Sequence, residues 1–116
     1  MKNQSFLARL GNAIRGLQHA WWGERSFRSQ VVIGVLALGL FIWSQPSALW
    51  WGAIVIAVAL VIAAELVNSS IEALADHLHP QQDPAIGKVK DMAAGTVLVM
   101  SIAAALVGIL AVLDSL

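Results

Sequence analysis

The sequence predicts an all-α membrane protein, with one amphipathic helix lying in the membrane interface and three helices that cross the bilayer. Of its 116 residues, 59% are apolar and 12% are charged, and the mean hydropathy is +0.76. A soluble domain carries about 25% charged residues. Residues 29–64 form an uncharged run of 36, and residues 92–113 form another of 22. Since a bilayer core takes about 20 helical residues, these runs have room for nearly two spans and for one span.

The interfacial helix is expected over residues 5–22. At about 100° per residue, its apolar side chains gather on one side and its polar ones on the other. The apolar side holds Phe6, Leu10, Ile14, Leu17 and Trp21, and the polar side holds Asn12, Arg15, Gln18 and His19. Packing on a soluble core is the other interpretation, but the rest of the chain supplies no such core. Basic and aromatic members favour the interface.

The spans are expected at about 28–44, 48–78 and 91–113, within a single domain covering residues 1–116. Proline and small polar residues at 44–47 indicate a tight turn between the first two. Tryptophans flank this turn, where an aromatic belt belongs. Residues 77–91, with two prolines, are expected to form the connecting loop.

Charge predicts the orientation. Five of the seven lysines and arginines lie in residues 1–28, and the other two are Lys88 and Lys90. By the positive-inside rule, the N-terminus and the 77–91 loop face the cytoplasm of a bacterial inner membrane, and the C-terminus lies outside. A net charge of zero creates no bulk field to recruit nucleic acid. The lack of cysteine excludes disulfides and thiolate metal sites.

A polar face on the second span is the main functional signal. Asn68, Glu72 and Asp76 fall within about 60° of Glu65 on a helix. Glu65 comes 17 residues after Ala48, about 26 Å along the helix, which places it near the inner edge of the hydrocarbon. Asp76 lies about 16 Å further toward water. Carboxylates at membrane depth are costly and mark functional sites.

These residue types suit phosphoryl transfer. Carboxylates repel phosphates unless a metal intervenes, and Mg²⁺ binds through one or two carboxylates plus substrate phosphates. Lys90 supplies a point charge for phosphate. The third span is expected to begin near Asp91, where its N-terminal dipole would favour anions. Glu24 could join from the cytoplasmic side.

A family resemblance adds to this interpretation. Residues 65–76 (ELVNSSIEALAD) and 90–97 (KDMAAGTV) resemble the signature of the prokaryotic diacylglycerol kinases. The resemblance extends to Gly16-Leu17, Ala20-Trp21, Glu24 and Phe27-Arg28. These kinases carry no phosphate-binding glycine loop, and neither does this chain.

The resemblance implies roles for individual residues. Glu65 matches the general base for the lipid hydroxyl, and Glu24 and Glu72 match the carboxylates that hold Mg²⁺ on ATP. Asn68, Lys90 and Asp91 match residues around the phosphates, and Asp76 one nearer the nucleoside. The implied nucleotide border is Gln81, Gln82 and Asp83, and the implied lipid entry is Trp21, Arg28, Gln30 and Glu65. The family is homotrimeric, with sites between subunits.

The function expected from these observations is transfer of the ATP γ-phosphate to diacylglycerol, which gives phosphatidic acid. Residues 20–21 and 27–28 favour this substrate, whereas residues 91–97 resemble the branch that phosphorylates undecaprenol. A small proton- or cation-conducting bundle is an alternative of another class, and a structural or regulatory membrane subunit is a third. His77 and His79 have no third ligand in register and are assigned no metal.

Overall fold

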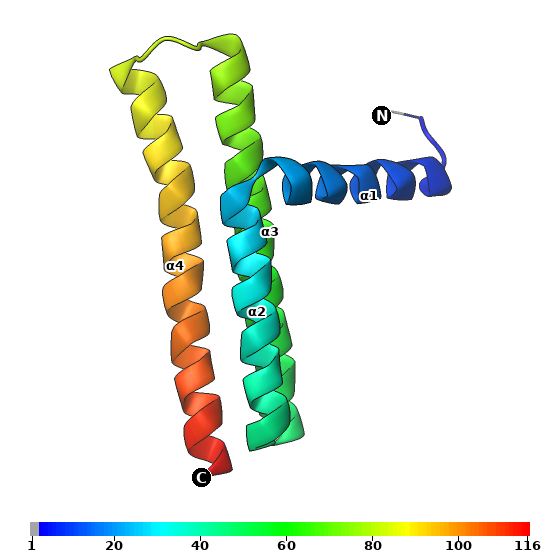
Figure 1. The fold of residues 1–116 in the computed structure, drawn as a ribbon, viewed down its shortest axis with the longest axis vertical. Coiled ribbons are helices and arrows are strands. Elements are labelled where there is room, and N and C mark those ends of the chain that lie inside the picture. Colours follow the sequence, from blue (N-terminus) through cyan, green and yellow to red (C-terminus); the bar gives the residue numbers. More distant parts are fainter. Residues whose placement is uncertain (1–2) are drawn as a thin grey trace.

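The computed structural model describes residues 3–116, which form four helices: α1 (Phe6–Gly23), α2 (Arg25–Ser44), α3 (Ala48–Leu78) and α4 (Pro84–Ser115). Figure 1 shows α2, α3 and α4 running along the long axis, while α1 projects sideways from them. Each of α2, α3 and α4 is long and apolar enough to cross a bilayer. The prediction of an all-α protein with three apolar spans is therefore confirmed.

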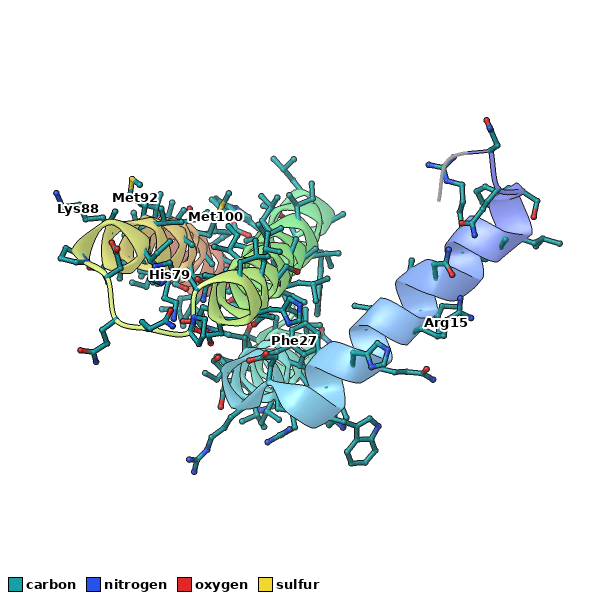
Figure 2. All side chains as sticks on the ribbon, turned by 90° about the horizontal axis from the view of Figure 1, so that it is seen from above. Arg15, Phe27, His79, Lys88, Met92 and Met100 are labelled. Atoms are coloured by element: carbon teal, nitrogen blue, oxygen red, sulfur yellow. The ribbon has the colours of Figure 1, made fainter. Side chains whose placement is uncertain are left out.

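The elbow between α1 and α2 consists of one non-helical residue, Glu24, in an extended conformation (φ −120°, ψ 107°). The Arg28 guanidinium closes the elbow by donating a hydrogen bond of 2.7 Å to the carbonyl oxygen of Trp21. Carbonyls in the last turn of a helix have no partner within the helix, so this bond satisfies one of them. Seen from above in Figure 2, α1 extends away from the bundle, and the buried Phe27 lies where the two meet.

The helices at the 45–47 turn match the predicted boundaries closely. Gln45 takes a left-handed conformation (φ 53°) after α2, and α3 then runs from residue 48 to residue 78 as expected. The expected starts of α1 and α2 were residues 5 and 28, and the structure starts them at residues 6 and 25. We call this end of the bundle the turn end, and the end bearing residues 79–83 the loop end.

The start of α4 differs from the prediction. The helix begins at Pro84, seven residues before the expected start near Asp91, so the predicted 77–91 loop shrinks to residues 79–83. Asp83 explains the early start, because its side chain accepts a hydrogen bond of 2.8 Å from the Ala85 backbone N–H. Proline at the first helical position and aspartate at the N-cap both favour helix initiation.

Packing is densest between α3 and α4, followed by α2 and α3. At the turn end, Phe41, Ile54 and Ala111 form a buried apolar cluster, with Trp51 edge-on to Phe41 at a centroid distance of 6.4 Å. The backbone N–H of Ser47 donates to Asp114 Oδ2 at 3.3 Å and ties the turn to α4. Most large apolar side chains on the spans remain exposed, as expected for surfaces that meet lipid or other chains.

Candidate active site

The polar face of α3 changes steadily in burial along the helix. Glu65 is 4% exposed and Asn68 is 8% exposed, whereas Glu72 is half-buried and Asp76 is exposed. The Asn68 amide donates a long hydrogen bond of 3.5 Å to Glu65 Oε1. The structure thus has the expected gradient from a buried acid to a solvated one, over three turns of one helix.

An ion pair joins this face to α4. Lys90 Nζ lies 2.5 Å from Asp76 Oδ1, and its ammonium is also within electrostatic range of Glu72. Lys88 is exposed, and its side chain lies on the side of α4 away from α3 (Figure 2). The two lysines therefore point in different directions, and of the two only Lys90 faces the acidic side chains of α3.

The structure contradicts the expectation that a helix dipole favours anion binding at Asp91. Since α4 begins at Pro84, Lys90 and Asp91 lie about two turns inside the helix, away from its N-terminal N–H groups. The dipole effect falls off within the first turn, so it does not assist anion binding at these residues. The Asp91 side chain is exposed and has no hydrogen-bond or ion-pair partner among residues 3–116.

Glu24 reaches the same level of the bundle from the elbow. The 20 residues of α2 measure about 30 Å, and the same length along α3 from Ala48 ends near Asn68. By this arithmetic the elbow lies at the level of the segment that holds Glu65 and Asn68, and α1 also contacts α3. Glu24 is half-buried. Within the described part of the chain, no three His, Asp or Glu side chains cluster closely enough to hold a metal.

The loop end contains a cavity of about 540 Å³ between α3 and α4. Of the predicted nucleotide border, Gln81, Gln82 and Asp83 all line it, together with Asp76 and Lys90. Asp83 also caps α4, a structural role that the sequence analysis missed although an Asp-Pro pair signals it. The His79 Nδ1 lies 3.0 Å from the Gln81 carbonyl, and its Nε2 lies 3.9 Å from Asp83 Oδ2.

The predicted lipid residues lie in two places. Trp21 and Arg28 are both half-buried and form the elbow, where the Arg28 guanidinium is engaged by a backbone carbonyl. Gln30 lines a separate, mainly apolar cavity of about 510 Å³ between α2, α3 and α4. The structure therefore does not bring Gln30 and Arg28 into one polar pocket with Glu65.

Comparison with known proteins identifies the family of this chain. The family model described as prokaryotic diacylglycerol kinase matches residues 11–112. The chain belongs to this family. A diacylglycerol kinase of Escherichia coli K12 is 33% identical over 94 residues, covering 81% of this chain and 77% of the relative. A diacylglycerol kinase of Helicobacter pylori is 33% identical over 84 residues, which cover 72% of this chain and 66% of that relative.

A longer diacylglycerol kinase, from Synechocystis, is 34% identical over 102 residues, which cover 83% of this chain and 55% of that relative. The resemblance found in residues 65–76 and 90–97 is thereby confirmed. As a member of the prokaryotic diacylglycerol kinase family, the chain is a membrane lipid kinase. The matched residues include the elbow, the polar face of α3 and Lys90.

Proposed function

We propose that this protein transfers the γ-phosphoryl group of ATP to the hydroxyl of diacylglycerol, giving phosphatidic acid, at the cytoplasmic face of the membrane. The observation that carries the proposal is the buried Glu65 carboxylate, placed on one helical face below Glu72 and the Asp76–Lys90 pair. A carboxylate at the membrane-buried end of this row of charged side chains can meet a lipid hydroxyl on its membrane side and a polyphosphate on its water side.

Glu65 is the proposed general base. As the acceptor hydroxyl attacks the γ-phosphorus, a new O–P bond forms and the bond to the bridging oxygen of ADP breaks. The hydroxyl proton passes to the Glu65 carboxylate, which must come within hydrogen-bond reach of it. The Asn68 amide, which donates to Glu65 Oε1, would orient that carboxylate.

Lys90 is the proposed cation for the phosphates, and Asp76 holds its ammonium at the loop end. The adjoining cavity of about 540 Å³, lined by residues 79–84, has room for the nucleoside end of ATP. This arrangement supports the placement of Asp76, Gln81 and Gln82 near the nucleotide. Asp91 would act from the exposed side of α4.

Glu24 and Glu72 are the carboxylates that would hold Mg²⁺. Both are half-buried, and neither side chain has a hydrogen-bond or ion-pair partner in the described residues. Hard oxygen donors of this kind suit Mg²⁺, which needs only one or two carboxylates beside substrate phosphates. When bound, the ion neutralises charge that develops on the transferring group. We also propose a homotrimer with sites between subunits, as the family resemblance implies. The many large apolar side chains exposed on the spans leave surface for such contacts.

The membrane placement follows the charge pattern. We propose that α1 lies in the interface, that the N-terminus and residues 79–83 are cytoplasmic, and that the C-terminus is outside. The sideways direction of α1 supports this, because a helix that runs across the direction of the spans can lie along a membrane surface (Figure 1). The elbow would then mark the interface, close to the level of Glu65.

Undecaprenol is the second candidate acceptor, because residues 91–97 resemble the branch that uses it. The test uses one preparation in mixed micelles with Mg²⁺ and labelled ATP. Parallel reactions contain either diacylglycerol or undecaprenol as the acceptor lipid. We expect labelled phosphatidic acid from the first lipid and little product from the second. Labelling of undecaprenol alone would overturn the proposal that diacylglycerol is the substrate. Labelling of neither lipid would overturn the kinase proposal.

A further inference from the structure

Ser69 carries a buried hydroxyl that has no part in the proposed phosphoryl transfer. It is 4% exposed, as is Glu65 one turn away, and its Oγ has no hydrogen-bond partner. Only three buried side-chain polar atoms in residues 3–116 lack a partner: Ser44 Oγ, Asn68 Oδ1 and Ser69 Oγ. Ser44 lies at the turn end, whereas Asn68 and Ser69 are neighbours beside the proposed base.

Two other serines of these helices show which partner a helical hydroxyl can find within its own chain. Ser70 Oγ donates to the Leu66 carbonyl at 2.9 Å, and Ser29 Oγ donates to the Arg25 carbonyl at 3.1 Å. Both bonds run back to the residue four positions earlier, the usual partner for serine inside a helix. A buried polar group without a partner is destabilising. Because the Ser69 hydroxyl makes no bond to its own chain, it is available to a group that arrives with a substrate.

The position of Ser69 on α3 indicates which partner it meets. It lies one turn toward the loop end from Glu65 and about one turn before Glu72, on the same helical face. If the proposed function holds, the acceptor hydroxyl meets Glu65 and the ATP phosphates meet Glu72. The phosphoryl group in transit then passes the level of Ser69.

We propose that Ser69 is a further catalytic residue, whose hydroxyl donates a hydrogen bond to an oxygen of the transferring phosphoryl group. The acids on this face accept hydrogen bonds when ionised and cannot donate them. A neutral donor adds stabilisation of the transferring oxygens without adding charge. Because Ser69 lies one turn from Glu65 on the same helical face, a substrate hydroxyl that reaches Glu65 also comes within a turn of Ser69.

The test compares Ser69→Ala and Ser69→Cys with Ser70→Ala, a matched control whose hydroxyl already bonds to its own helix. Cysteine nearly keeps the shape of serine but is a weak donor. For both Ser69 variants we expect kcat to fall about 10²-fold, with the KM values for ATP and diacylglycerol unchanged. Their melting temperatures should equal or exceed that of the parent, because an unsatisfied hydroxyl has been removed. Ser70→Ala should retain the parent kcat.

Two outcomes would overturn the role of Ser69: a kcat of Ser69→Cys equal to that of Ser70→Ala, or a loss of activity that only follows a loss of folded protein. The second result would mean that Ser69 bonds to another chain or to a structural water. If the unmodified protein labels no lipid, the proposed function fails and this inference fails with it. An active parent with an active Ser69→Cys variant rejects the inference alone.

Discussion

The two halves of α3 are both buried by neighbouring helices but differ in what they bury. Toward the turn end, Ile54 packs with Phe41 and Ala111 in an apolar cluster. Toward the loop end, Glu65, Asn68 and Ser69 are just as buried, and two of their polar atoms have no partner. One half of α3 therefore buries apolar side chains that pack together, and the other half buries polar atoms that lack hydrogen-bond partners.

The comparison teaches where stability and function reside. In a membrane, apolar packing is held by close van der Waals contact, since lipid tails are as apolar as leucine. The apolar half of α3 can therefore be judged from its contacts within the chain. The polar half carries buried polar groups without partners, which destabilise the protein on their own. The proposed function accounts for them through partners that arrive with the substrates. The two halves should respond in opposite ways to substitution.

Glu65→Gln should give the largest effect, and it tests the polar half. If Glu65 is the base, kcat should fall about 10²–10⁴-fold, while the apparent affinity for ATP changes little because the proposal places the phosphates at Glu72 and Lys90. Measurement of turnover and of nucleotide binding on the same preparation separates the two effects. A variant with full turnover would remove Glu65 from the chemistry.

Phe41→Ala tests the apolar half. Truncation of a buried phenylalanine costs about 3–5 kcal/mol, and Phe41 is 5% exposed. We expect the denaturant midpoint in micelles to fall sharply while turnover per folded molecule stays the same. Ile42→Ala is the control, because Ile42 is 66% exposed on the same turn. Equal midpoints for the two variants would show that the Phe41 cluster does not hold the bundle together.

Gly34→Ala sharpens the same contrast on a smaller scale. A Cβ at Gly34 would lie 2.9 Å from Val58 Cγ1, so either the Val58 side chain or one of the helices α2 and α3 would have to shift. Overpacking of this kind costs about 1–3 kcal/mol. Gly39 of the same helix has nothing within 4 Å of such a Cβ, so Gly39→Ala should be neutral or stabilising. Thermal unfolding of the pair decides the point, and a destabilised Gly39→Ala variant would contradict it.

Asp76→Asn should have the smallest effect on stability. The pair with Lys90 is largely exposed, and exposed ion pairs add little to stability. We expect an unchanged melting temperature and a KM for ATP that rises a few-fold, because Lys90 loses its anchor. Asp114→Asn, which alters the contact with Ser47 at the turn end, should leave that KM unaltered. A similar rise in both variants would place the effect outside the nucleotide site.

The fold was largely predictable because its signals are local. Uncharged runs, the turn at residues 44–47 and the helical spacing of the polar face each depend on residues close in sequence. The error at the start of α4 had a physical cause: the polar residues around Pro84 indicate a loop, but Asp83 and Pro84 together start a helix. The candidate site residues Glu65, Glu72 and Lys90 were chosen from the helical spacing of the polar face and from the family resemblance, and their roles remain predictions.

The sequence by itself determined the number and order of the helices and the membership of the polar face, since hydropathy and a period of 3.6 act within each segment. Only the tertiary structure decided that Asp76 meets Lys90, that Arg28 closes the elbow on Trp21, and that Ser69 is buried without a partner. Those facts depend on the angle at the elbow and on how the helices pack against one another. Side-chain spacing along one helix does not specify which neighbour fills the space beside it.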